Sequence, residues 1–487
     1  MSGLAFSSAR ELVARMARRE VSSRELLDHF VARVERCNAP LNAVVTLDLE
    51  RARARAAAAD EALARGTSWG PLHGLPVTIK DTWETAGIRS TAGAPQYAQH
   101  VPATDAVAVR RLVDAGCVVF GKTNTPTLGG DVQTYNPVFG VTNNAWNPAR
   151  TSGGSSGGAA TAVATGMSAF ELGSDIGGSI RTPSNWSGVY GLKTTYGIVP
   201  MRGHVPPLPG VLAPADLCVA GPIARAASDL DLLLEVVAGP LEEEATGWRL
   251  ALPPPRRASL REYRVAAWLD DPAYPVDAAV LERLQATVAA LRGAGVTVDE
   301  RARPAFALAD CMRDYQRLLY AVIAADFPRD AFEGFLAAAA GADPTASDAF
   351  SRFVTFGTAR HRDWLAAREA GVRYRAALRD FFRTHDVLLC PVTSVPAIPH
   401  DNVDPMPARK ILVNGAARPY DDLFAWISIA TLGYLPAASA PVGRTADGLP
   451  VGVQIVAPYL EDRTAIDFAR RLGDVVGGFE APPGYAE

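Results

Sequence analysis

Two glycine-rich segments that each carry a serine, and one lysine upstream of them, supply the groups that acyl transfer requires. The first segment is Gly153-Gly154-Ser155-Ser156-Gly157-Gly158, and the second is Asp175-Ile176-Gly177-Gly178-Ser179-Ile180-Arg181. The lysine ends the apolar run Pro76-Val77-Thr78-Ile79-Lys80. Amide hydrolysis needs a nucleophile, donors that stabilise the oxyanion and a proton for the leaving nitrogen. These three segments together can meet all three needs.

Ser179 is the candidate nucleophile, because the two glycines before it let the backbone bend tightly. Successive N–H groups in such a bend can point toward one anion. The backbone amides of Ile176, Gly177, Gly178 and Ser179 are therefore the candidate oxyanion hole. Losing one such donor typically raises the barrier by about 2.7–4 kcal/mol.

The base that activates this serine is expected to be a lysine. The chain has seven histidines, and none lies in or beside either serine segment. Lys80 ends an apolar strand, where burial can lower the pKa of a lysine from about 10.4 to near 7. A neutral amine could then accept a proton. Ser155, in its glycine-rich loop, is the natural relay between Lys80 and Ser179.

The sequence resembles the amidase signature family. Both serine segments and the lysine match that family, and so do the intervals of 75 residues from Lys80 to Ser155 and 24 residues from Ser155 to Ser179. The match extends from about residue 70 to 240 and returns near the C-terminus. Further matching segments are Pro71-Leu72-His73-Gly74, Asn143-Asn144-Ala145-Trp146-Asn147-Pro148, Gly191-Leu192-Lys193 and Gly448-Leu449-Pro450-Val451-Gly452.

The resemblance implies a Ser–cis-Ser–Lys triad. In it Ser179 attacks, Ser155 follows a cis peptide bond and shuttles the proton, and Lys80 is the ultimate base. It also implies that the backbone around Gly129 lines the substrate site. The residues that support the loops by hydrogen bonding would be Ser156, Asp175 and Arg181. The implied reaction is hydrolysis of a carboxamide or anilide, with some esters and carbamates also accepted.

The expected fold is a single α/β/α domain over residues 1–487, built on a large mixed, mostly parallel twisted sheet flanked by helices. Apolar runs such as Val77–Lys80 and Cys117–Phe120 alternate with helical patterns, which is typical of α/β proteins. N-terminal helices are expected over 1–66, the core with the catalytic loops over 70–240, and a helical insertion that shapes the pocket over 300–384. The stretch from 123 to 215 shows little periodicity and is expected to be dominated by functional loops.

Composition limits the classes of partner. A net charge of −4 gives no basic footprint for nucleic acid or an anionic membrane, and no run of about 18 apolar residues predicts a membrane span. The five cysteines are widely spaced and form no metal motif, which favours a reducing, cytoplasmic location. We expect a small-molecule amide or carbamate substrate, no cofactor and no metal. A homodimer is the common oligomer of soluble enzymes.

Three other functions remain open from the sequence. Gly153-Gly154-Ser155-Ser156-Gly157 also fits the G-x-S-x-G motif of α/β-hydrolase esterases, with His385-Asp386 or His400 as later triad partners. An inactive scaffold would be expected to lose a triad member, and none is lost. Within the family, a component of an amidotransferase for charged tRNA, working with partner subunits, is another possibility. The Pro-rich loop at 202–210 looks more like that of stand-alone amidases.

Overall fold

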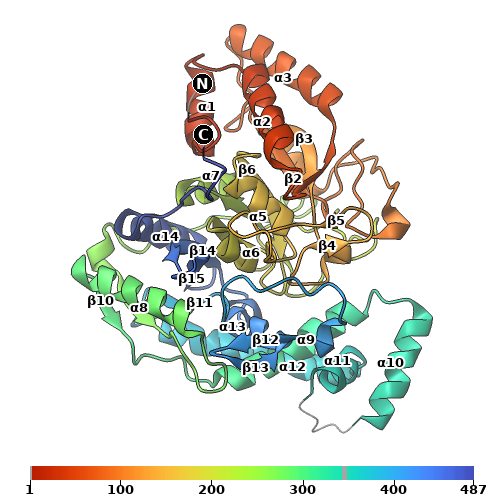
Figure 1. The fold of residues 1–487 in the computed structure, drawn as a ribbon, viewed down its shortest axis with the longest axis vertical. Coiled ribbons are helices and arrows are strands. Elements are labelled where there is room, and N and C mark those ends of the chain that lie inside the picture. Colours follow the sequence, from red (N-terminus) through yellow and green to blue (C-terminus); the bar gives the residue numbers. More distant parts are fainter. Residues whose placement is uncertain (1–2, 343–347, 487) are drawn as a thin grey trace.

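An eight-stranded sheet forms the centre of the molecule (Figure 1). The computed structural model describes residues 3–342 and 348–486. In spatial order the strands are β10 (Thr297–Asp299), β9 (Arg264–Ala267), β11 (Val387–Pro391), β15 (Pro450–Val456), β14 (Ala437–Arg444), β7 (Tyr190–Lys193), β8 (Val219–Ala224) and β6 (Phe170–Asp175). Helices α5 (Gly157–Ala164) and α6 (Arg181–Ser187) pack on it as one group, and α7 (Ala227–Val237), α8 (Ala278–Gly293) and α14 (Asp462–Val476) as another.

The expected large mixed sheet flanked by helices is confirmed, but its share of parallel pairing is smaller than expected. Only β10–β9 and β9–β11 pair in parallel, and the other five neighbours pair antiparallel. A short connection explains one of these pairs. The loop from Thr445 to Leu449 joins β14 to β15, and so few residues allow only an antiparallel pair.

A separate three-stranded sheet carries the lysine. Its order is β1 (Val44–Leu47), β3 (Val118–Thr123) and β2 (Pro76–Lys80), with β2 and β3 parallel and α4 (Val107–Asp114) between them in the chain. Every residue of β2 is buried. The amide of Thr78 donates to Ser168 Oγ at 3.0 Å, and the Thr78 hydroxyl donates to the Glu171 carboxylate of β6. These contacts place the lysine strand against the edge of the large sheet.

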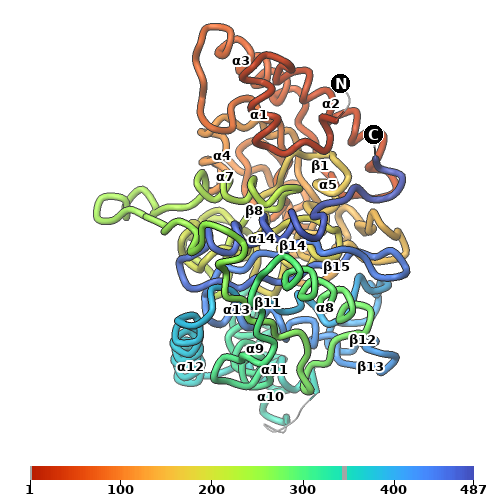
Figure 2. Tube along the Cα trace, turned by 90° about the vertical axis from the view of Figure 1, so that its left-hand side faces the viewer, coloured from red at the N-terminus to blue at the C-terminus, as the bar shows by residue number. Residues whose placement is uncertain are grey.

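The N-terminal helices follow the sequence closely. They are α1 (Ala9–Ala17), α2 (Ser23–Cys37) and α3 (Leu49–Ala64). Ser22 and Glu25 form the capping box that satisfies the first free N–H groups of α2. The two ends of the chain lie side by side in both views (Figures 1 and 2). There Arg33 of α2 donates to the carbonyl of Tyr485 at 2.7 Å.

The stretch from 123 to 215 holds more regular structure than its composition predicts. It contains α5, β6, α6 and β7, together with the short strands β4 (Tyr135–Asn136) and β5 (Gly140–Val141). Every residue of α5 and of α6 is buried. Helix α5 consists mostly of alanine and glycine and has no polar face, so the periodicity that normally identifies a helix is missing there.

The segment 300–384 is helical, as expected, over its described part. Its helices are α9 (Leu308–Ala324), α10 (Arg329–Gly341), α11 (Ala349–Gly357) and α12 (His361–Phe381), and residues 343–347 lie outside the described chain. Figure 2 shows these helices at the opposite end of the molecule from α1–α3. The remaining elements are α13 (Ala425–Leu432) and the hairpin of β12 (Lys410–Val413) with β13 (Ala416–Pro419).

Two further expectations concern cysteines and membranes. All five cysteines are buried free thiols. Within residues 3–342 and 348–486, no helix combines the length and apolarity needed to cross a bilayer.

Candidate active site

Lys80 lies at the C-terminal end of β2 with its side chain inaccessible to solvent. Its Nζ is hydrogen-bonded to Ser155 Oγ at 2.7 Å and to Ser174 Oγ at 2.9 Å. The chain has only four lysines, and Lys80, Lys122 and Lys193 are all fully buried. Lys122 and Lys193 each donate to backbone carbonyls, and Lys122 also donates to the hydroxyls of Thr85 and Ser90. The hydroxyls bound to Lys80 differ from these because they line the cavity. Lys80 is therefore the lysine placed to exchange a proton with a serine.

Burial lowers the pKa of Lys80 to about 7. The nearby Cys218, Asp175 and Glu171 act in the opposite direction, but they do not offset the loss of hydration. Burial also raises the pKa of the Cys218 thiol to about 12 and that of Glu171 to about 8. A substantial fraction of Lys80 is thus a neutral amine at neutral pH. Such an amine can accept a proton from Ser155.

The loop that carries Ser155 is shaped by close backbone contacts. The peptide bond between Gly154 and Ser155 is cis. A Cβ on Gly154 would lie 2.6 Å from the carbonyl oxygen of Asp131, so only glycine fits there. The next amide, that of Ser156, donates to the Ser179 carbonyl at 3.1 Å. The two serine loops are therefore joined directly, with Ser155 and Ser179 on one cavity.

Asp175 and Arg181 hold the loop of the candidate nucleophile in place. The Asp175 carboxylate accepts from the Arg181 guanidinium at 2.8 and 3.0 Å, and both side chains are fully buried. Burial acts to raise the pKa of Asp175, but the charge and hydrogen bonds of Arg181 outweigh it, so this pKa lies below its usual value. Arg181 also donates to Gln454 Oε1 of β15 and Thr431 Oγ1 of α13. The loop is thus anchored to the C-terminal part of the chain.

One of the four amides expected to form the candidate oxyanion hole is already engaged. The Gly178 amide donates to Asp175 Oδ1 at 3.0 Å, so it is already engaged by the carboxylate that shapes the loop. The amides of Ile176, Gly177 and Ser179 have no hydrogen-bond acceptor within the described chain. Tyr315 of α9 fixes this bend from outside, because its hydroxyl donates to the Ile176 carbonyl at 2.9 Å. Three free donors remain for an oxyanion.

A cavity of about 340 Å³ opens onto the three amides and both serines. Gly129 lies on its wall, and a Cβ at that position would be 3.4 Å from Ser155 Oγ. Most of the wall is apolar and comes from segments far apart in the sequence. Its apolar residues are Leu128, Val132, Ile176, Pro206, Pro207, Ala215, Leu319, Val322, Ile323, Phe327, Met406 and Phe424. A larger hollow of about 820 Å³ near Arg111 and Arg249 contains none of the candidate catalytic residues.

Ser174 and His204 are two residues of the site that are absent from the candidates drawn from the sequence. Ser174 Oγ lies between Lys80 Nζ and His204 Nε2, at 2.9 and 2.8 Å. Both residues line the cavity. Ser174 directly precedes the Asp175 motif and could have been found there as one more hydroxyl. His204 lies 25 residues after Ser179, and no local pattern connects it to Lys80.

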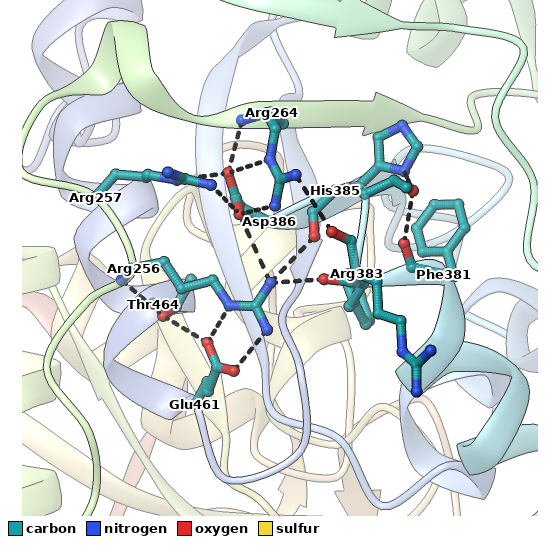
Figure 3. Close-up of polar contacts among 11 residues, drawn as sticks. Arg256, Arg257, Arg264, Phe381, Arg383, His385, Asp386, Glu461 and Thr464 are labelled. Carbon is teal, nitrogen blue, oxygen red and sulfur yellow. Dashed lines mark hydrogen bonds and ion pairs between the residues drawn. The ribbon is translucent and has the colours of Figure 1, made fainter.

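The histidine–aspartate alternative is not supported by the geometry. The Asp386 carboxylate, at the start of β11, pairs with Arg257 at 2.9 Å and with Arg264 at 2.9 Å (Figure 3). The His385 ring stacks on Phe381 with ring centroids 4.8 Å apart. Neither His385 nor Asp386 lines the cavity, and His400 hydrogen-bonds the carbonyl of Pro148. A Ser155–His–Asp triad is therefore not formed.

The chain is similar to known proteins over most of its length. The family model described as Amidase matches residues 25–466. A glutamyl-tRNA(Gln) amidotransferase subunit from Synechococcus sp. (strain CC9605) is 34% identical, with 95% of each chain covered. A crystal structure of an amidase matches with 28% identity and a TM-score of 0.78, covering 97% of this chain and all of that one. The structure of 6-aminohexanoate cyclic dimer hydrolase matches with 27% identity and a TM-score of 0.79, covering 100% of this chain and 99% of that one.

The buried lysine should make stability depend on pH in a defined direction. Lys80 has a pKa of about 7 in the folded protein, against about 10.4 unfolded, so the unfolded chain binds more protons between these values. Stability is therefore lost as the pH falls from 10 to 7, and Lys80→Met removes this loss. We expect the unfolding free energy of Lys80→Met relative to wild type to rise by about 3 kcal/mol over that interval.

Denaturant titrations of both proteins at pH 10 and pH 7 measure this difference. The same comparison with Lys410→Met, at an exposed lysine, provides the control. A difference between Lys80→Met and wild type that stays constant across this range would show that Lys80 is not desolvated as described.

Proposed function

This chain belongs to the amidase family, is a hydrolase acting on C–N bonds, and we propose that it cleaves small carboxamides and anilides through an acyl-enzyme on Ser179. In this proposal Ser155 relays the proton and Lys80 is the base. One observation carries the proposal. The buried Lys80 amine lies 2.7 Å from Ser155 Oγ, and Ser155 opens onto the same cavity as Ser179.

Acylation begins when Ser179 Oγ attacks the amide carbonyl carbon. The Ser179 proton passes to Ser155 Oγ as the Ser155 proton passes to Lys80 Nζ. The oxyanion binds to the free amides of Ile176, Gly177 and Ser179. When the C–N bond breaks, Ser155 protonates the leaving nitrogen and recovers its proton from Lys80. The products of this half-reaction are a free amine and the Ser179 ester, and the base is neutral again.

Deacylation repeats these transfers with water in place of the amine. Water attacks the Ser179 ester and loses its proton through Ser155 to Lys80. The C–O bond then breaks, and the Ser179 oxygen receives a proton back along the same path. Lys80 gains and returns one proton in each half-reaction. A pKa of about 7 suits both directions, because a base poised near the working pH balances them.

The supporting residues act by holding these groups still. Asp175 and Arg181 keep the Ser179 loop bent, and Ser156 joins it to the Ser155 loop. Gly129 leaves room for substrate beside Ser155. A displacement of about 1 Å in such a site can reduce a rate by roughly a hundredfold. These roles should therefore affect turnover although none of these side chains reacts.

The lining of the cavity favours substrates with an apolar acyl or amine portion. Asp131 contributes little free charge, because Arg409 pairs with it at 2.6 Å and the Tyr420 hydroxyl donates to it at 2.8 Å. Esters and carbamates pass through the same tetrahedral oxyanion, and we include them as substrates. An ester releases a better leaving group than an amide, so it depends less on protonation by Ser155.

A second candidate function is that of a tRNA amidotransferase component, favoured by the 34% identity with the Synechococcus protein of that description. The solved structures of an amidase and of 6-aminohexanoate cyclic dimer hydrolase match over nearly the whole chain as well. Pro206 and Pro207 form part of the cavity wall together with Ser155. Because this Pro-rich loop resembles that of stand-alone amidases, we prefer the stand-alone amidase function. Purification from the native source with stoichiometric partner subunits would favour the amidotransferase.

The single domain, cytoplasmic location and homodimer stay predictions.

Covalent labelling tests the nucleophile. Incubation with a fluorophosphonate, followed by intact-mass analysis and peptide mapping, should show one adduct at Ser179. Ser179→Ala should abolish it. Lys80→Ala should slow it by at least about a hundredfold near pH 7, because general-base assistance is lost. Labelling at Ser155 or at another serine would contradict the assignment, and no labelling of the wild type would favour an inactive scaffold.

The relay is tested by comparing leaving groups. Ser155→Ala should slow hydrolysis of an acyl p-nitroanilide roughly tenfold more than hydrolysis of the p-nitrophenyl ester with the same acyl group, since the nitrogen needs the proton more. Ser152→Ala lies in the same region but does not line the cavity, and it should leave the amide-to-ester ratio unchanged. Equal losses on both substrates would refute a proton relay through Ser155.

A further inference from the structure

We propose that His204 is a positioning residue for Lys80, acting through Ser174 to keep the lysine lone pair directed at Ser155. The inference rests on the proposed function, in which Lys80 is the base. His204 belongs to the loop after β7 and lies outside both β2 and the serine segments. Its ring reaches the cavity wall beside Ser174.

A chain of four hydrogen bonds carries the inference. His204 Nδ1 lies 2.7 Å from the Pro206 carbonyl oxygen, and His204 Nε2 lies 2.8 Å from Ser174 Oγ. Ser174 Oγ lies 2.9 Å from Lys80 Nζ, and Lys80 Nζ lies 2.7 Å from Ser155 Oγ. All of these side chains are buried. The chain therefore runs from a fixed backbone carbonyl to the relay serine without an exposed member.

The first bond fixes the direction of the others. A carbonyl oxygen only accepts, so His204 Nδ1 must carry the hydrogen. In a neutral imidazole Nε2 is then an acceptor, and Ser174 must donate its single proton to it. Ser174 Oγ can consequently only accept from Lys80. A neutral amine has two N–H groups and one lone pair. With an N–H group engaged by Ser174, the lone pair is left for the Ser155 hydroxyl.

His204 stays neutral throughout the working range. Burial, followed by the nearby charge of Lys80, lowers the pKa of His204 to about 3. The indole of Trp83 packs against the imidazole at an interplanar angle of 71°, with centroids 4.7 Å apart, and limits its rotation. The titratable groups facing Lys80 are Cys218, Asp175 and Glu171. None of them is hydrogen-bonded to Ser174 or His204, so they do not set the direction of the chain.

If the His204 Nε2 acceptor is lost, the Ser174 hydroxyl should be free to donate its hydrogen elsewhere. Ser174 could then donate to the lone pair of neutral Lys80 and compete with Ser155 for it. The Lys80 amine would remain buried and neutral, but its lone pair would be occupied by the Ser174 hydroxyl. This predicts a slower reaction without a higher pKa for Lys80. A variant that merely loosened the site would do the opposite, because water entering the cavity would raise this pKa toward 10.4.

The second-order rate of Ser179 modification by a fluorophosphonate, measured from pH 5 to 10, tests the inference. His204→Leu should lower the plateau rate at least tenfold, with the midpoint of the pH profile at or below that of the wild type. His204→Gln retains an acceptor oxygen and should recover most of the rate. His400→Leu removes another histidine that hydrogen-bonds a proline carbonyl but does not line the cavity, and it should leave the rate unchanged.

A double-mutant cycle isolates the role of Ser174. In a Ser174→Ala background no competing hydroxyl exists, so adding His204→Leu should change the rate by less than twofold. A tenfold effect that persists in this background would overturn the inference, and so would a midpoint that moves upward or a His204→Leu protein as fast as wild type. Wild-type protein that is never modified at Ser179 would instead overturn the proposed function, and this inference with it.

Discussion

The burial of one amine, that of Lys80, away from solvent is the constraint on which the rest of this structure depends. Lowering the pKa of Lys80 from 10.5 to about 7 corresponds to roughly 5 kcal/mol of lost hydration of the ammonium form. This cost arises because buried elements surround the end of β2. Among the described residues, the hydrogen-bond partners of the amine are the hydroxyls of Ser155 and Ser174. Removing either partner or admitting water would change the proton affinity that makes the lysine useful.

The two sheets meet at this amine, which explains why so much of the chain is needed for one site. Lys80 comes from the small sheet, and Ser174 comes from β6 at the edge of the large one. Arg181 then connects the loop of the candidate nucleophile to Gln454 and Thr431, more than 240 residues away in the sequence. A buried ion pair such as Arg181 with Asp175 adds little net stability over a well-packed apolar pair, but it fixes geometry through its directional bonds. Here that geometry is the bend that leaves three amides free.

The sequence alone allowed the candidate catalytic residues and the elements with a polar face to be predicted. Ser155 and Ser179 open onto one cavity, Lys80 is hydrogen-bonded to Ser155, and α1–α3 form within the expected range 1–66. Helix α5 escaped detection because burial on all sides removes the amphipathic period. The engaged Gly178 amide and the link from His204 to Ser174 also escaped, since both depend on directions of donors and acceptors that only the folded chain defines.

Because the chain has only four lysines, the protonation state of Lys80 can be observed directly. Protein carrying lysine labelled with ¹³C at Cε would give four side-chain signals in an NMR titration, and Lys80→Met would assign one of them. This signal should titrate with a midpoint near pH 7. A midpoint near 10.4, the value for a hydrated lysine, would contradict the claim that a buried neutral amine is the base.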